Sequence, residues 1–169
     1  MDFLEKDLEN IVFNASDEQL NKRGLQVKGK RFRQLRIGNY GIADMVTAEL
    51  RSTYHGDKYY KITIYELKKD KIEIGAYLQA LNYAVGLISY LEKRTSISIL
   101  VNIVLIGKTV NKVSNAVYLQ RLFTNTSFDI ETYTGIGSVD IYEYTYELDG
   151  LKFNSLNRDY ALVNEGFNF

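Results

Sequence analysis

Apolar residues follow two different periods along the first part of the chain. In DFLEKDLENIVF they recur every three to four residues, which predicts an amphipathic helix. The segment SDEQL then predicts a short turn capped by Ser16 or Asp17. A period of two predicts a strand from Leu25 to Ile37, and GNYG (38–41) predicts a turn after that strand.

The period of two continues through two more segments. IADMVTAELR predicts a second strand, STYHGDK predicts a hairpin loop, and YKITIYELKK predicts a third strand. Three such strands in series predict an antiparallel meander, with successive side chains on opposite faces of the sheet.

From Ile72 the helical period returns and predicts a long helix that ends near EKR. The nearly unbroken apolar run ISILVNIVLIG is typical of a strand covered on both faces. NKVSNAVYLQRLF predicts another helix, and VDIYEYTYELDGLKF predicts a hairpin with a type I′ turn at Asp149-Gly150. The whole chain, residues 1–169, therefore predicts a single α/β domain, a central mixed sheet flanked by helices, with a C-terminal β-hairpin.

Composition narrows the chemistry available to this domain. The chain has 169 residues, 46% of them hydrophobic and 25% charged, which is typical of a globular protein with its own core. It has no cysteine, so disulfides, thiolate metal sites and cysteine nucleophiles are excluded. A single histidine, His55, excludes multi-histidine metal sites, and its place in STYHGDK favours a solvated loop residue.

Net charge and hydropathy bear on location and partners. The formal net charge is zero, which argues against a generic polycationic nucleic-acid binder. MDFLEKDLEN is charged from its second residue, unlike a signal peptide, and no apolar run approaches the roughly 18 residues of a membrane span. We expect a soluble cytoplasmic protein without membrane contact, or one of the virion or host cytoplasm if a phage encodes it.

Positive charge is concentrated in one segment. No acidic residue lies between Glu18 and Asp44, where seven lysines and arginines occur. Those of the expected strand, together with its one glutamine, are Lys30, Arg31, Arg33, Gln34 and Arg36. Two interpretations fit this segment: an edge strand protected from further pairing by its charges, or a surface that binds phosphates.

Two neighbouring strands each carry an acid on an apolar face. By alternation Asp44 shares the face of Val46, and Glu66 and Lys68 continue the face of Ile64. If the two strands pair around the loop at 52–58, the two carboxylates lie close together. Two adjacent carboxylates stay ionised only beside a cation, and oxygen ligands of this kind suit Mg²⁺ or Mn²⁺.

The spacing Asp44…Glu66-Leu67-Lys68 is a D…(D/E)xK pattern and resembles the PD-(D/E)xK nuclease superfamily. The order of expected elements is similar to that superfamily's restriction-endonuclease-like core. QALNY (79–83) matches the QxxxY extension of some branches, and its first and last residues share one helix face. EKDLE (5–9) resembles the acidic helix motif of the branched-DNA and Holliday-junction endonucleases.

A more particular resemblance runs through RFRQLRIGNYGIADMVT and YYKITIYELKKDKIEIGAYLQALNY. These segments are similar to the catalytic domain of archaeal and actinobacterial mismatch endonucleases. The likeness covers a core of about residues 3–106 and leaves 107–169 as an extension. Ala43 stands where the superfamily's nominal proline would be. The DNA-clamping domain of those enzymes has no counterpart here, so their substrate preference does not carry over.

The resemblance implies Mg²⁺- or Mn²⁺-dependent hydrolysis of phosphodiester bonds in DNA, with RNA as a further candidate substrate. It implies that Asp44, Glu66 and the Leu67 carbonyl ligate the metal, and that Glu5 acts in the outer coordination sphere. Lys68 would position the attacking water or contact the scissile phosphate.

The remaining implied roles concern the DNA backbone. Gln79 and Tyr83 would orient Lys68 or the backbone, and the basic strand would follow the phosphates through Arg31, Arg33 and Gln34.

Each candidate residue also has a structural interpretation. Glu66 and Lys68 can form an ion pair at a strand end, and Gln79 and Tyr83 can be ordinary helix residues. Glu9 competes with Glu5 for the role of the helix acid.

The protein as a whole has alternatives as well. It can be a catalytically idle module of the same fold that binds nucleic acid or serves as a structural part of a larger complex, for example in a phage. It can also be a nuclease that acts as a homodimer or needs a partner protein. The tyrosine-rich segment VDIYEYTYEL fits either an interface strand or a strand pair that extends the central sheet.

Overall fold

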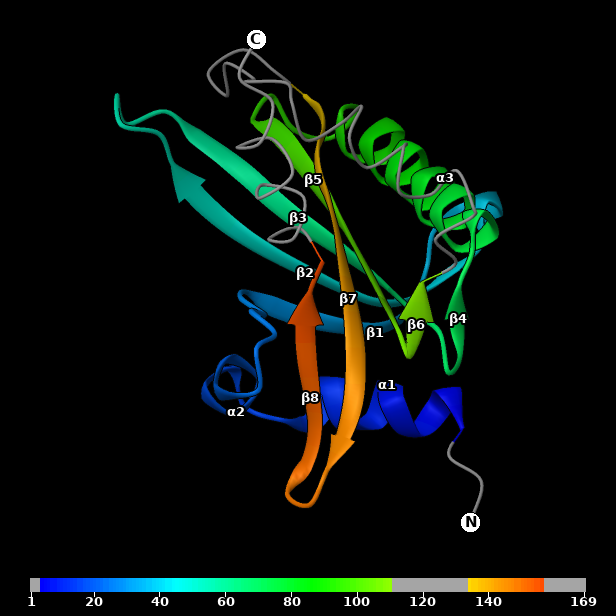
Figure 1. Cartoon of the computed structure of the whole chain (residues 1–169). Coiled ribbons are helices and arrows are strands. Elements are labelled where there is room, and N and C mark those ends of the chain that lie inside the picture. The colour runs from blue at the N-terminus through cyan, green and yellow to red at the C-terminus, as the bar shows by residue number, and fades with distance from the viewer. Residues whose placement is uncertain (1–3, 111–133, 157–169) are drawn as a thin grey trace, which may run out of the picture.

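A six-stranded mixed sheet forms the centre of the protein, for which a computed structural model describes residues 4–110 and 134–156 (Figure 1). Its strands, in spatial order, are β1 (Lys30–Arg36), β2 (Ile42–Ser52), β3 (Lys58–Leu67), β5 (Ser98–Gly107), β7 (Gly135–Glu147) and β8 (Gly150–Ser155). β3–β5 and β5–β7 are parallel pairs, and the other three pairs are antiparallel. The predicted fold class, an α/β fold with a mixed central sheet, flanking helices and a C-terminal hairpin, is confirmed.

Helices cover both faces of this sheet. They are α1 (Glu5–Asn14), α2 (Asp17–Lys22), the 3₁₀ turn η1 (Gly38–Tyr40) and α3 (Ile74–Leu91). A small parallel pair of β4 (Lys71–Ile72) and β6 (Thr109–Val110) flanks the sheet. α2 begins as predicted, because the Ser16 hydroxyl accepts from the Gln19 amide at 3.1 Å while the Gln19 side chain accepts from the Ser16 amide.

The core lies in two layers, one on each face of the sheet. Ile64 and Val101 pack with Tyr83 on the α3 side, whereas Tyr65 packs with Leu8 on the α1 side. The strict alternation predicted for β3 therefore holds, and β5 is covered on both faces as its apolar run predicted. Of the helices in the described residues, none is long and apolar enough to cross a membrane.

The first strand is shorter than its apolar period predicted. β1 begins at Lys30 rather than Leu25, because Gly29 has a φ of +95°, which lies outside the extended region. Leu25 and Val27 are nevertheless buried against the α1-side core, which explains their apolar character without a strand. β1 forms one edge of the sheet, as the edge-strand interpretation of its charges required.

The C-terminal hairpin is an integral part of the sheet. β7 pairs with β5, so the strand pair extends the central sheet, and Tyr144 of the tyrosine-rich segment is buried within the chain. The turn differs from the prediction: Glu147 pairs with Gly150, and Asp149 keeps a negative φ, so the turn is not type I′. The helix predicted from NKVSNAVYLQRLF lies outside the described residues.

Candidate active site

The candidate site lies where β2 and β3 diverge. The last paired residues of the two strands are Met45 and Tyr65, so Asp44 and Glu66 are the next residue beyond the ladder on each strand. The backbone amide of Leu67 has no strand partner on this side and donates to Oδ2 of Asp44 at 2.9 Å. The fork between two neighbouring strands therefore brings the two predicted carboxylates together.

β2 loses its alternation just before this fork. Ala43 and Val46 both belong to the core under α3, although strict alternation would place them on opposite faces. The strand enters from Gly41, whose φ is +121°, and runs opposite Gln34, whose φ is +47°. These irregularities turn Asp44 into a cleft of about 690 Å³ beside α1, so the prediction that it shares the face of Val46 is wrong.

Glu66 is buried with only one of its oxygens paired. The residue is 1% exposed, and its Oε1 accepts from Nζ of Lys68 at 2.7 Å. Its Oε2 is buried and has no hydrogen-bond partner among the described residues. A buried charged oxygen without a partner destabilises a fold, so this atom requires either a proton or a cation.

The pKa values of both carboxyl groups reflect this arrangement. Burial, followed by the charge of Asp44, raises the pKa of Glu66 to about 7, although Lys68 opposes the rise. Burial also raises the pKa of Asp44, while the Leu67 amide and Lys68 lower it and the charges of Glu5 and Glu9 raise it further. The site is therefore short of positive charge at neutral pH.

Lys68 supplies part of that positive charge. Its partial burial lowers its pKa, but the hydrogen bond and charge of Glu66 and the charges of Glu5 and Asp44 outweigh burial and raise it overall. Lys68 is consequently an ammonium at neutral pH. It can donate hydrogen bonds to an anion or to a water, and it cannot act as a base there.

Of the two candidate acids on α1, Glu5 is the one open to the site. Its Oε2 accepts from the backbone amide of Lys69 at 3.3 Å, so it lies directly beside the segment after β3 that carries Lys68. Glu9 also borders the cleft, but its Oε1 is paired with Nε of Arg33 at 2.5 Å and the residue is buried. The structure thus favours Glu5 over Glu9 for a role toward a bound cation.

The predicted helix pair Gln79 and Tyr83 is formed. Nε2 of Gln79 donates to the Tyr83 hydroxyl at 2.6 Å. Burial and the charges of Glu66 and Asp44 contribute to a raised pKa for Tyr83, so α3 brings its phenol within electrostatic reach of the carboxylates. A Cβ on Gly41 would lie 2.8 Å from the Tyr83 ring, which means that only glycine lets the start of β2 pass this close.

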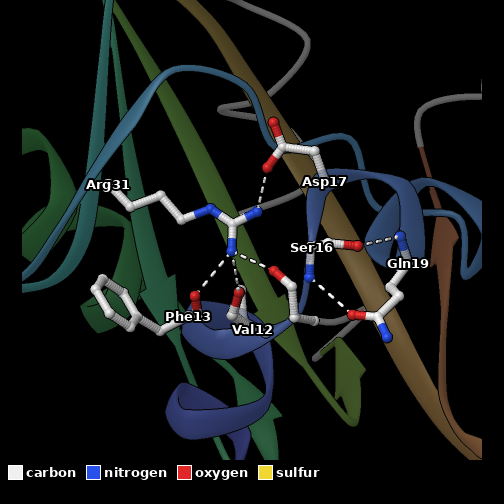
Figure 2. A network of polar contacts seen from close by, with 7 residues as sticks. Val12, Phe13, Ser16, Asp17, Gln19 and Arg31 are labelled. Atoms are coloured by element: carbon white, nitrogen blue, oxygen red, sulfur yellow. Dashed lines mark hydrogen bonds and ion pairs between the residues drawn. The ribbon is translucent and has the colours of Figure 1, made fainter.

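The basic residues of β1 divide into two groups. Arg31 donates to the carbonyls of Val12, Phe13 and Ala15 at the end of α1 and pairs with Asp17 (Figure 2). The guanidinium of Arg31 is therefore committed to the protein itself, and the proposed contact with phosphates would cost these bonds.

Arg33 is also engaged, but at the cleft. It pairs with Glu9 and donates to Oδ1 of Asn10 at 2.6 Å, and it borders the cleft together with Gln34. Lys30 and Arg36 are exposed on the edge strand, with Lys30 lying over the Phe32 ring. The side chains of the basic strand most accessible to a phosphate backbone are thus these two.

Some of this arrangement had no sequence signal. Gln34 lies opposite Asp44 with a left-handed backbone, which no motif indicates, and Lys6 borders the cleft on α1. Tyr144 of β7 donates to the carbonyl of Lys69 and so ties the last strands to the segment after Lys68. The odd Gln34 conformation is a form of backbone strain that concentrates at functional sites.

The donor set fits a divalent cation held mainly by water. No group of three or more histidine, aspartate or glutamate side chains converges as a metal site within 4–110 and 134–156. The carboxylates of Asp44 and Glu66 do lie close to each other, and Oε2 of Glu66 is buried without a hydrogen-bond partner in the described residues. Mg²⁺ is commonly held by one or two carboxylates and several waters, so these residues suit it.

Comparison of the chain with protein-family models, with curated proteins and with solved structures finds no match.

Proposed function

We propose that this protein is a metal-dependent nuclease that hydrolyses phosphodiester bonds in DNA at the fork between β2 and β3. One observation carries the proposal: Oε2 of Glu66 is buried without a hydrogen-bond partner in the described residues, beside the carboxylate of Asp44 and the ammonium of Lys68. The D…ExK order of these residues and their resemblance to the PD-(D/E)xK nucleases support the same reading.

Asp44 and Glu66, with the Leu67 carbonyl, would hold Mg²⁺ or Mn²⁺. Such an ion supplies a Lewis acid that lowers the pKa of a coordinated water and stabilises charge on the phosphate. Glu5, fixed by the Lys69 amide, would accept hydrogen bonds from waters around the ion.

The remaining side chains of the site act on the substrate. Lys68 stays protonated, so it donates to an oxygen of the scissile phosphate or orients the attacking water. Tyr83 stays a phenol and, with Gln79 on its oxygen, has a proton to donate toward the same phosphate. Lys30 and Arg36 bind the phosphate backbone along the edge of the sheet.

A structural ion pair explains less of this site. Such a pair accounts for the contact between Glu66 and Lys68, but it leaves Oε2 of Glu66 without a hydrogen-bond partner among the described residues, beside the charge of Asp44. Two carboxylates close enough for the charge of one to raise the pKa of the other are unfavourable unless a cation is recruited, which is the reason to favour a working site.

The test is cleavage of supercoiled, linear duplex, single-stranded and branched DNA, and of RNA, with Mg²⁺, Mn²⁺ or EDTA. We expect cleavage that requires the metal and falls at least about a hundredfold in Asp44→Asn and in Lys68→Ala. Glu49→Gln, which alters an acid paired with Arg51 away from the fork, is the control and should cleave like the wild type.

An inactive wild type across this panel, with no metal binding by calorimetry, would contradict the proposal. The protein would then be a catalytically idle module of the fold. Cleavage restored only by a further protein would instead identify a subunit of a larger nuclease.

A further inference from the structure

A second recess lies beside η1, the 3₁₀ turn that leads into β2. It has a volume of about 250 Å³ and lies between η1 and the second half of α3. Its principal lining residues are Ile37, Tyr40, Gly86, Tyr90, Lys93 and Arg94. We call this recess the η1–α3 groove.

Two tyrosines present their rings at the groove. Tyr40 is 39% exposed and Tyr90 is 53% exposed, although both line the same recess. Tyr40 is held in place, because its carbonyl accepts from Nδ2 of Asn82 at 2.9 Å and a Cβ on Gly86 would lie 2.6 Å from its ring. The Tyr40 ring therefore rests on the bare backbone of α3.

The second ring is fixed by a cation. The guanidinium of Arg94 lies 3.7 Å from the centre of the Tyr90 ring, and Nη1 of Arg94 donates to the Tyr90 carbonyl at 3.0 Å. Arginine stacked on an aromatic ring is a planar platform on which a nucleobase can continue the stack.

The charge of the groove has one sign. Lys93 and Arg94 line it and, within 4–110 and 134–156, no acidic residue does, so these residues attract anions to the recess. Basic residues after a helix C-terminus also interact favourably with the helix dipole, which accounts for their presence at the end of α3. That effect does not account for two partly exposed tyrosines in the same recess.

The groove and the candidate active site share one structural element. Tyr40, the last residue of η1, forms part of the groove wall, Gly41 packs on Tyr83, and Asp44 follows three residues later on β2. Four residues span at most about 13 Å even when fully extended, so the backbone of Tyr40 lies within a few nucleotides' length of Asp44. A bound strand can therefore reach both.

We propose that the η1–α3 groove binds an unpaired segment of the nucleic-acid substrate, with a base stacked against Tyr40 and Tyr90 and the phosphates on Lys93 and Arg94. This inference rests on the proposed nuclease function and names its substrate class: single-stranded nucleic acid, or a duplex with an unpaired segment. A fully paired duplex has no free base face to offer, so the groove selects against it.

Binding is tested separately from cleavage, in full-length Asp44→Asn protein with EDTA present. The probes are oligonucleotides of mixed sequence, single-stranded or fully duplex, that carry 2-aminopurine. We expect single strands to bind more tightly than duplex, with quenching of 2-aminopurine by the tyrosines. Tyr40→Leu and Tyr90→Leu should each weaken single-strand binding at least about fivefold and reduce the quenching.

The charges give a second readout. Lys93→Ala together with Arg94→Ala should lower the slope of log affinity against log salt by about 1.4, the value for two phosphate contacts on a single strand. Tyr54→Leu, at a tyrosine that is 99% exposed on the β2–β3 loop, and Lys152→Ala on β8, at a lysine paired with Glu147, are matched controls and should leave affinity and slope unchanged.

The outcomes separate this inference from the nuclease proposal. Tyrosine variants that bind and quench like the wild type would overturn the groove, even if the protein cleaves DNA through Asp44. Equal affinity for duplex and single strands, or no binding of either probe, would overturn it as well. Loss of stability alone in the Lys93 and Arg94 variant, with an unchanged salt slope, would assign both charges to the helix dipole.

Discussion

At Glu66 the protein buries a carboxyl group whose pKa is raised to about 7 from 4.5, first by burial and then by the charge of Asp44. A group with a raised folded-state pKa stabilises the fold fully below the unfolded value and loses that contribution as pH rises through the folded value. Without metal, stability should therefore fall between about pH 4.5 and pH 7. One pKa unit corresponds to about 1.4 kcal/mol, so the loss is roughly 3 kcal/mol.

Glu66→Gln should remove this loss. We expect the variant to be more stable than the wild type at pH 8 without metal, with a flatter pH dependence of the free energy of unfolding from urea denaturation. Mn²⁺ should raise the melting temperature of the wild type and not of the variant, and the increase should be larger at pH 8 than at pH 6, because the cation must displace a proton at low pH.

The opposite result has a definite meaning. If Glu66→Gln lowers stability at pH 8 without metal, the pairing of Glu66 with Lys68 is a structural ion pair. Glu49→Gln, which alters a more exposed acid paired with Arg51, serves as the control and should change stability little.

Gln34 has a left-handed backbone opposite Asp44, with a φ of +47°. This backbone conformation destabilises the folded state of a non-glycine residue by about 1–2 kcal/mol. Glycine avoids that cost, but its greater conformational entropy in the unfolded state offsets part of the gain. We expect Gln34→Gly to raise the free energy of unfolding by up to about 1 kcal/mol. The variant should nevertheless cleave more slowly, because it lacks the side-chain amide that borders the cleft. Stability by urea denaturation and cleavage rate decide this; increased stability with unchanged cleavage would mean that the side chain has no part in the site.

Among the elements, α1 depends on a residue of the edge strand. Arg31 of β1 donates to three carbonyls at the end of α1 and pairs with Asp17 at the start of α2, so one guanidinium joins two helices to the sheet (Figure 2). This is a large share of the hydrogen bonding at that helix end, because the last carbonyls of a helix lack partners within it.

Arg31→Ala should destabilise the protein by about 2 kcal/mol, since several carbonyls lose a charged donor. Arg36→Ala should cost less than about 0.5 kcal/mol, because Arg36 is exposed. The salt dependence of DNA binding should show the reverse: a slope reduced by about one in Arg36→Ala and unchanged in Arg31→Ala. If a folded Arg31→Ala protein shows a reduced slope of log affinity against log salt, Arg31 contacts the phosphates after all.

For the whole molecule, the last two strands, β7 and β8, are needed to complete the sheet and both layers of the core. β7 covers the open edge of β5, and Ile141 lies in the α3-side core while Phe153 lies in the α1-side core. The amide of Phe153 also donates to the carbonyl of Arg23 at 2.7 Å. Residues far apart in sequence thus close both layers.

A chain ending at Gly107 should therefore fail to fold cooperatively, although the sequence resemblance to the PD-(D/E)xK nucleases was confined to about residues 3–106. Loss of the β5–β7 pairing would expose a long apolar strand edge, which promotes aggregation. Circular dichroism and urea denaturation test this. A stable, cooperative 1–107 fragment would contradict this account.

Tyr144→Phe is a smaller change in the same strands. The variant should fold and yet cleave more slowly, because the Lys69 carbonyl beside Lys68 loses its donor.

Much of the architecture follows from local pattern. The helix from Ile74, the doubly covered β5 and the alternation of β3 were all predictable, because each depends on backbone geometry and on the polarity of near neighbours. The pairing of the two strands also brought Asp44 and Glu66 together as their positions suggested. The start of β1 and the hairpin turn were wrong, since single backbone angles at Gly29 and Asp149 decided them.

The sequence by itself determined the elements, the meander and the acids and lysine that gather at its end. Only the tertiary structure decided which charged groups remain accessible. Arg31 donates hydrogen bonds to the end of α1, and Glu9 is paired with Arg33. Glu66 keeps a buried oxygen without a partner in the described part of the chain. The physical reason is range. The periodicity of a segment indicates which face of its helix or strand a residue lies on. The ion pairs and the desolvation of a charged side chain depend instead on residues from distant segments.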